Sequence, residues 1–329
     1  MTRPMHQDAA AAAVLRRIMV LLLLLLMFSL SSFPSVTAEC PYKCTCDEEH
    51  IVDCNKQELN RIPDRISPAT KILDLSRNKI RDIEPKAFTY LTQLNKLDLS
   101  RNEIRDIEPN SFTHLTELTS LHLDYNKISN LKIGAFANLS KLQILYLFSN
   151  EIENIETGVF NNLTSLECLL LHGNKIHKLD LEMFKGLTKL EILFLNYNKI
   201  RNIPPGIFDS LTSLSGLDLN HNPLTCDCNM KLLANWLKKN YPDRIFISLK
   251  RMMCYFPVEM RELSLEKITE IDIHCTSPDI IVVPENKTVS VGEQLQLSCK
   301  AVGDPEPFIT WAKDDIDLEL GQRVQVRLF

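Results

Sequence analysis

Glycine is scarce in this chain, with 9 residues among 329. Glycine-rich loops that cradle phosphate groups need closely spaced glycines, and neither the P-loop pattern nor the dinucleotide-binding pattern occurs in the sequence. After the amino terminus, no apolar run approaches the ~20 residues that a membrane-spanning helix needs. The sequence therefore supports neither a nucleotide-dependent enzyme nor, past its first residues, a membrane span.

The one long apolar run covers residues 18–30, follows two arginines and precedes a group of small residues that ends at Ala38. This order predicts a secretory signal peptide over residues 1–38, cleaved after Ala38. A retained membrane anchor is the alternative, but the run is short for a span. Removing three arginines and one aspartate changes the formal net charge from −5 to −7, and this mild acidity does not favour nucleic acid.

Ten cysteines in an exported chain predict disulfide bonds. One cluster contains Cys40, Cys44, Cys46 and Cys54, and a second contains Cys226, Cys228, Cys254 and Cys275. Each cluster allows three connectivities, and zinc ligation is the competing interpretation. Cys168 and Cys299 stand apart. Glycosylation sequons at Asn138, Asn162 and Asn286 fit the same exported setting.

A 24-residue period organises the middle of the chain. Asparagine recurs at Asn78, Asn102, Asn126, Asn150, Asn174, Asn198 and Asn222, and phenylalanine at Phe88, Phe112, Phe136, Phe160, Phe184 and Phe208. Leucine pairs such as Leu97 and Leu99 keep the same phase. This is the L-x-x-L-x-L-x-x-N pattern of leucine-rich repeats.

The pattern predicts an α/β solenoid shaped like a horseshoe. Each repeat supplies one short strand, and the strands stack about 4.8 Å apart into a parallel sheet with the leucines inside. Asparagine satisfies backbone groups at the turn, and the phenylalanines form a spine on the far side. We expect repeats over residues 71–221 between cysteine-rich caps at 39–70 and 222–275. The second cap should contain a helix over residues 230–239 with Trp236 and Leu237 on its apolar face.

Residues 276–329 have a different character, because alternating apolar residues lead to Cys299 and then to Trp311. This segment resembles the first half of an I-set immunoglobulin domain, an all-β sandwich. The second cysteine of such a domain is missing, so we expect an incomplete domain from a truncated product or fragment.

Residues 40–275 resemble extracellular leucine-rich-repeat units with cysteine-rich flanks, as in proteins of the Slit, AMIGO, LINGO and peroxidasin type. The resemblance implies the disulfide pairs Cys40–Cys46, Cys44–Cys54, Cys226–Cys254 and Cys228–Cys275. It also implies a location outside the cell or on the outer face of the plasma membrane, as for adhesion and matrix proteins.

The concave sheet is the surface that such a solenoid offers to a partner. By phase, its outer repeats carry polar residues such as Ser76, Ser100 and Asp124. Its middle is apolar, and contiguous exposed aromatic surface usually marks an interaction site. We expect the partner-binding residues to be Tyr125, Tyr146, Phe148, Leu170, Ile192, Phe194 and Tyr197.

Two other constellations on this face carry less weight. Asp74 and Asp98 lie on adjacent strands at the spacing of a retaining glycosidase pair, but the face is open and solvated charges are the simpler interpretation. His122 and His172 lie two repeats apart, too far to share a metal ion. We expect Cys168 to face outward and to be partly covered by Leu170 or Ile192; a disulfide to a second chain is the alternative.

These observations predict a binding module that needs no cofactor and is not an enzyme. Its partner would be an extracellular or cell-surface protein, reached through adhesion, receptor or guidance-type recognition. The alternatives are a fragment of a peroxidasin-like haem peroxidase without its catalytic domain, and an innate immune receptor. Nothing in the sequence indicates the oligomeric state.

Overall fold

The computed structural model describes residues 40–84, 86–240, 246–284, 294–295, 297–304, 309, 312–313, 316–317 and 326–327. Three features expected from the sequence lie outside the described residues: the signal peptide at 1–38, the sequon at Asn286 and the tryptophan at Trp311.

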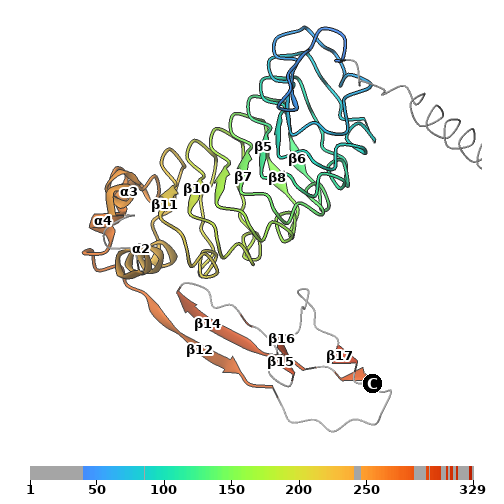
Figure 1. Ribbon diagram of the computed structural model, residues 1–329. Helices are drawn as coiled ribbons and strands as arrows, with labels where there is room; N and C mark the ends of the chain where they lie inside the picture. The colour runs from blue at the N-terminus through green and yellow to red at the C-terminus, as the bar shows by residue number, and fades with distance from the viewer. Residues whose placement is uncertain are drawn as a thin grey trace, which may run out of the picture.

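A nine-stranded sheet runs through the molecule, and Figure 1 shows its strands stacked along a curved solenoid. The strands are β1 (Thr45–Cys46), β2 (Ile51–Asp53), β3 (Ile72–Asp74), β4 (Lys96–Asp98), β5 (Ser120–His122), β7 (Ile144–Tyr146), β9 (Cys168–Leu170), β10 (Ile192–Phe194) and β11 (Gly216–Asp218). Only β1 and β2 pair antiparallel; every later neighbour is parallel. The register steps by one repeat, since Leu73 pairs with Leu97 and Leu97 with Leu121. The predicted leucine-rich-repeat solenoid is confirmed.

Each of the seven repeat strands, from β3 to β11 in this sheet, turns its central leucine into the core and its two flanking residues toward the concave side. The asparagine that follows connects neighbouring repeats. Asn102 is buried; its Oδ1 accepts the Ile80 N–H at 3.0 Å, and its Nδ2 donates to the carbonyl oxygens of Leu75 and Leu99 at 2.9 and 3.1 Å. Backbone groups that leave the sheet therefore find partners inside the protein.

The convex side of the repeats is built from turns, and the helices of the α/β solenoid lie in its second cap. Within the described residues of the repeats, no helix occurs. Bonds from residue i+3 to residue i recur instead, as from Leu91 N to Phe88 O and from Leu94 N to Leu91 O. A 24-residue repeat leaves too short a return segment for a stable helix. The short strands β6 (Asn130–Leu131) and β8 (Asn154–Ile155) pair on this side.

The phenylalanine spine fills the space under these turns. All six spine phenylalanines are fully buried. The rings of Phe88 and Phe112 stack with centroids 5.8 Å apart, and so do the successive rings from Phe136 to Phe208, with 6.1 Å between Phe136 and Phe160. Cross-repeat stacking thus adds to the hydrophobic burial that holds the solenoid together.

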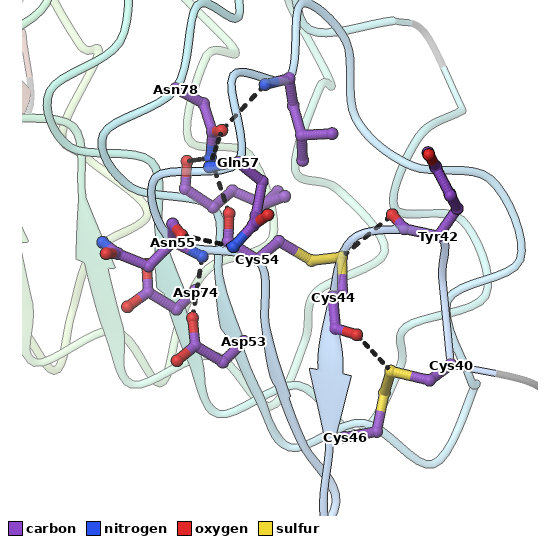
Figure 2. Close-up of a disulfide and its surroundings, with 12 residues drawn as sticks. Cys40, Tyr42, Cys44, Cys46, Asp53, Cys54, Asn55, Gln57, Asp74 and Asn78 are labelled. Carbon is purple, nitrogen blue, oxygen red and sulfur yellow. Dashed lines mark hydrogen bonds between the residues drawn. A yellow bond between two sulfur atoms is a disulfide. The ribbon is translucent and has the colours of Figure 1, made fainter.

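Cysteine-linked caps close both ends. Figure 2 shows the first cap, where Cys40 bonds to Cys46 and Cys44 to Cys54, while Asn78 reaches across to donate to Cys54 O at 2.9 Å. At the other end, the bonds are Cys226–Cys254 and Cys228–Cys275. These are the pairs implied by the resemblance to extracellular repeat proteins.

Helices cover the end of the solenoid after β11 (Figure 1): α2 (Cys228–Asn240), α3 (Phe246–Arg251), a 3-10 helix at Val258–Met260 and α4 (Leu265–Ile268). The helix expected at 230–239 is confirmed as part of α2, with Leu237 buried and Trp236 packed against the core. No helix among the described residues has the length and apolar character needed to cross a bilayer.

Beyond the cap, the chain forms short strand pairs. β12 (Thr276–Val282) pairs antiparallel with β14 (Lys300–Asp304), β13 (Gln294–Leu295) with β17 (Val326–Arg327), and β15 (Ala312–Lys313) with β16 (Ile316–Asp317). Cys299 and Cys168 are free thiols.

Candidate functional site

The outward positions of the sheet are mostly half-buried, because each side chain packs on its counterpart one repeat away. Three residues expected to face solvent are instead buried: Ser76, Ser100 and Asp124. The reason is local hydrogen bonding in the turn after each strand. Ser76 donates through its N–H and Oγ to Asp74 Oδ1 at 2.8 and 2.6 Å, and the Ser100 N–H donates to Asp98 Oδ1 at 2.9 Å. The serines are thereby drawn against the sheet.

The same bonds occupy the two aspartates. Asp98 is not the solvated charge expected from the sequence, since its side chain is 17% exposed and its Oδ2 lies 3.3 Å from His122 Nδ1. Both carboxylates hold turns, so neither is available as a free catalytic acid of a glycosidase pair.

Four of the seven expected partner-binding residues lie on β7, β9 and β10, and the other three, Tyr125, Phe148 and Tyr197, directly follow β5, β7 and β10. Tyr146, Leu170 and Phe194 are consecutive register partners on β7, β9 and β10. Ile192 lies two residues before Phe194 on β10 and is the register partner of Cys168. The side chains of these four and of Phe148 are half-buried, whereas Tyr125 and Tyr197 are 43% and 57% exposed.

Phe148 is the centre of a cluster of rings. Its ring centroid lies 5.3 Å from that of Tyr125 in an edge-on contact and 5.9 Å from that of Tyr146. On its other side, the His172 imidazole stacks almost parallel at 4.5 Å. These contacts hold the rings in place before any ligand arrives, and preorganised aromatic surface loses little entropy on binding.

Histidines extend the cluster in a way that the sequence reading missed. His172 also lies 6.3 Å from Phe194, edge-on, while His221 stacks on Tyr197 at 4.2 Å. His122 stacks on Tyr146 at 4.6 Å. All three histidines occupy outward positions of their repeats, at different points of the 24-residue period, whereas the sequence-based interpretation weighs only His122 and His172, as metal ligands.

Arg101 covers one end of the cluster. Its guanidinium carbon lies 4.0 Å from the centroid of the Tyr125 ring, within cation–π range. We call the residues from Arg101 to His221 that make these ring contacts the aromatic ladder: Arg101, His122, Tyr125, Tyr146, Phe148, His172, Phe194, Tyr197 and His221.

Ser120, His122 and Asp98 form a hydrogen-bonded chain in the order of a hydrolase triad. Ser120 Oγ lies 3.0 Å from His122 Nε2, and His122 Nδ1 lies 3.3 Å from Asp98 Oδ2. The Ser120 N–H donates to Asn95 O at 3.1 Å and therefore cannot stabilise an oxyanion. These two hydrogen bonds instead fix the His122 ring against Tyr146. Burial opposes ionisation of Asp98, but the bonds from His122 and Ser100 outweigh it and keep the Asp98 pKa below its usual value.

Burial shapes the electrostatics of the ladder. It lowers the pKa of His172, although the Asp218 charge opposes that effect, so the neutral imidazole is favoured. Burial also raises the pKa values of Cys168 and Tyr146. These shifts favour the uncharged forms of His172, Cys168 and Tyr146. Among the described residues, no group of three or more His, Cys, Asp or Glu side chains is arranged to hold a metal ion.

Comparison with known families agrees with this architecture. The sequence matches the leucine rich repeat family over residues 68–128, 116–176 and 166–224, and the immunoglobulin I-set domain over residues 278–328. The chain therefore contains leucine-rich repeats followed by an immunoglobulin I-set segment, an architecture typical of non-enzymatic binding proteins.

Several known proteins are similar to parts of the chain. It is 32% identical over 106 residues to human leucine-rich repeat-containing protein 24, covering 32% of this chain and 21% of that protein. It is 29% identical over 103 residues to Drosophila melanogaster peroxidasin, covering 31% of this chain and 7% of that protein. The chain thus spans about a fifth or less of these relatives, and the peroxidasin match covers no peroxidase domain.

A solved structure shares the fold. The crystal structure of a TLR13–ssRNA13 complex matches with a TM-score of 0.51 and 34% identity, covering 55% of this chain and 26% of that chain. The disulfides and these extracellular-type relatives together indicate a secreted or cell-surface protein.

Proposed function

We propose that this chain is an extracellular recognition module that binds a partner protein through the aromatic ladder on its concave sheet. The observation that supports this most is the continuity of the ladder: interacting rings extend over five adjacent strands from β5 to β11 on an open face. Aromatic residues with part of their surface exposed are the commonest hot spots of protein interfaces. Adhesion, receptor or guidance-type recognition is the class of function that this surface supports.

A nucleic-acid ligand is the second candidate, because stacked rings also accept bases and TLR13 was solved in complex with ssRNA13. Binding nucleic acid requires lysine or arginine near the phosphates. None of the concave positions on β7, β9, β10 or β11 carries either residue. A protein partner therefore fits the surface better.

The glycosylation sequons are compatible with this assignment. Asn138 and Asn162 are exposed and occupy equivalent positions one repeat apart, in the turns that follow the spine residues Phe136 and Phe160. Glycans attached there would cover the side of the solenoid opposite the sheet. The concave surface would remain free for the partner.

The proposal is tested by binding the labelled full chain to intact cells and comparing it with the variant F148A/F194A. Removing two hot-spot rings, each contributing about 2 kcal/mol, should weaken binding roughly a thousand-fold. The matched control is Y42A/Y90A, which removes two rings that are 86% and 75% exposed but lie outside the concave positions. Thermal unfolding of each variant separates loss of binding from loss of fold.

Two enzyme treatments identify the class of partner. Protease treatment of the cells should abolish binding, and nuclease treatment should leave it unchanged. Undiminished binding by a folded F148A/F194A variant would refute the site, and sensitivity to nuclease would favour the nucleic-acid candidate.

A further inference from the structure

His172 contacts both of the phenylalanine rings on which the proposed binding most depends. Its imidazole stacks on Phe148 with centroids 4.5 Å apart and an interplanar angle of 7°. It also meets the Phe194 ring edge-on at 6.3 Å. The side chain is half-buried on the concave face, so its position affects the shape of the surface that a partner covers.

The Nδ1 atom of His172 is buried and has no hydrogen-bond partner among the residues that the structure describes. Asn196 occupies the same position one repeat later, but its Oδ1 is also buried and unpaired, so the two side chains do not bond to each other. A neutral imidazole can leave one ring nitrogen unprotonated, whereas an imidazolium carries a proton on both. A buried donor without an acceptor is costly, most of all when it is charged. A protonated Nδ1 can therefore find a partner only if the ring moves out of its present position.

The other two ladder histidines are placed differently. His122 Nδ1 lies 3.3 Å from Asp98 Oδ2, so protonation strengthens an existing contact and leaves that ring where it is. His221 is exposed, so water can satisfy a charged ring there. Of the histidines within the described residues, His172 alone has a buried, unpaired ring nitrogen.

The electrostatic surroundings of His172 also disfavour its charged form. The titratable or charged side chains on the strands and turns around it are Tyr146, Glu151, Glu167, Cys168, Lys175, Glu191, Tyr197, Asp218 and His221. Burial lowers the pKa of His172 below its usual value of 6.5, and the Asp218 charge opposes this effect only in part. Glu151 and Lys175 pair with each other at 2.6 Å, and the other two glutamates directly precede β9 and β10, at the end of each strand away from His172.

From this geometry we infer that His172 is an acid-sensitive switch within the aromatic ladder, whose protonation displaces its ring from Phe148 and weakens the binding of the partner. The inference rests on the proposed function and adds its regulation. A ring that leaves the stack uncovers one face of Phe148 and removes a contact of Phe194. Protonation also places a charge in a surface that the partner covers with apolar groups. The partner is therefore held at neutral pH and released in acid.

The test measures binding of the labelled full chain to intact cells from neutral pH down to about pH 5, with circular dichroism at each pH to confirm the fold. Because binding excludes one proton, the affinity should fall by up to about ten-fold for each pH unit below the pKa of the free ring. His172→Phe removes the titrating group, and Phe148 occupies the same position one repeat earlier, so a phenylalanine suits this part of the sheet. This variant should lose the acid-dependent fall, whatever its affinity at neutral pH. If it misfolds, His172→Gln replaces it, because an amide does not titrate either.

Two control variants locate the effect. His177→Phe removes an exposed histidine outside the concave positions, and His221→Phe removes another histidine of the ladder; both should keep the full acid-dependent fall. Titration of the partner's own groups affects every variant equally, so the comparison between variants isolates His172.

An equal fall in His172→Phe and in the unmodified chain, or no fall in the unmodified chain, would overturn the inference. Cation–π attraction to Phe148 would then hold the charged ring in place. A fall that disappears in His221→Phe would also overturn it, because another histidine would then be the sensor. The proposed function is judged separately, by the binding of F148A/F194A at neutral pH.

Discussion

Replacing one asparagine of the solenoid should have a measurable cost that follows from its hydrogen bonds. Asn126 is buried between two repeats. Its Oδ1 accepts the Ile104 N–H at 3.0 Å, and its Nδ2 donates to Leu99 O and Leu123 O at 2.9 and 3.1 Å. Asn126→Ala removes these three bonds and a longer one to Asp124 O at 3.3 Å, without changing the leucine core.

The magnitude depends on which groups lose their last partner. Leu99 O still accepts from Asn102 Nδ2 at 3.1 Å, and Leu123 O still accepts from Asn150 Nδ2 at 2.9 Å. The Ile104 N–H has no such substitute in this network. A buried N–H left unpaired costs about 1–3 kcal/mol, and loss of each of the two shorter donor bonds, to Leu99 O and Leu123 O, costs about 0.5–1.5 kcal/mol. We therefore expect Asn126→Ala to lower the free energy of unfolding by about 3 kcal/mol.

Urea unfolding of the oxidised full chain, followed by circular dichroism, measures this change. Hydrogen exchange locates it, because the Ile104 amide should lose protection more than amides several repeats away. The control is Asn154→Ala, since Asn154 is exposed and bonds only to Asn130 Oδ1 at 3.0 Å; its effect should be within about 0.5 kcal/mol. A loss below about 1 kcal/mol for Asn126→Ala, or an unchanged Ile104 amide, would show that water replaces the asparagine and would refute the reasoning.

Three further outcomes follow from the structure. Replacing Cys226 and Cys254 by serine opens a loop with a sequence separation of 28 and should lower the free energy of unfolding by about 3.5 kcal/mol in urea titrations; a change near zero would contradict the role of the cap. Phe136→Ala should lower it by about 3–5 kcal/mol, because the ring is fully buried in the spine, and calorimetry would detect a smaller effect if the spine collapsed around the gap. Burial raises the pKa of Asp124, so the folded chain holds that proton more tightly than the unfolded chain does, and the ionised carboxylate opposes folding at neutral pH. Asp124→Asn should therefore stabilise the chain at neutral pH, with the gain disappearing as the pH falls below the usual carboxyl value of 3.8; equal urea midpoint shifts at both pH values would contradict this.

The repeat could be derived from the sequence because its signals are periodic and physically redundant. Leu97 and Leu99 specify the buried side of a strand, Asn102 specifies the turn, and Phe112 specifies the spine, all in one phase. Because all seven repeats share this phase, shifting the assignment in one repeat would put it out of register with the other six. The helix in the second cap was also accessible, since α2 has its own apolar stripe.

The return segments and the ladder were harder to predict, because they depend on distances between repeats. Phase placed His172 on the concave face but gave no sign that its ring would lie 4.5 Å from Phe148 and nearly parallel to it. Phase also placed Ser76 and Asp124 outward, although hydrogen bonds and burial in the turn draw both inward. Orientation of a side chain at the end of a short strand depends on the backbone of the following turn, which period alone does not determine.

The backbone of the turn after each strand shows where this chain does without glycine and what it gains from that. The residue before each of the seven periodic asparagines, from Asn78 to Asn222, has a left-handed φ, for example 56° at Arg77, 52° at Tyr125 and 55° at Tyr197, yet only Gly173 is a glycine. A side chain costs about 1–2 kcal/mol in this conformation, and the asparagine bonds on both sides of the turn hold the backbone there nonetheless. The left-handed residue leaves the line of the strand, so its side chain projects from the sheet. For this reason Tyr125 and Tyr197 are the most exposed of the seven expected binding residues. Glycine at these positions would relax the turn and remove the rings, so the strain is retained where the ladder presents its most accessible surface to a partner.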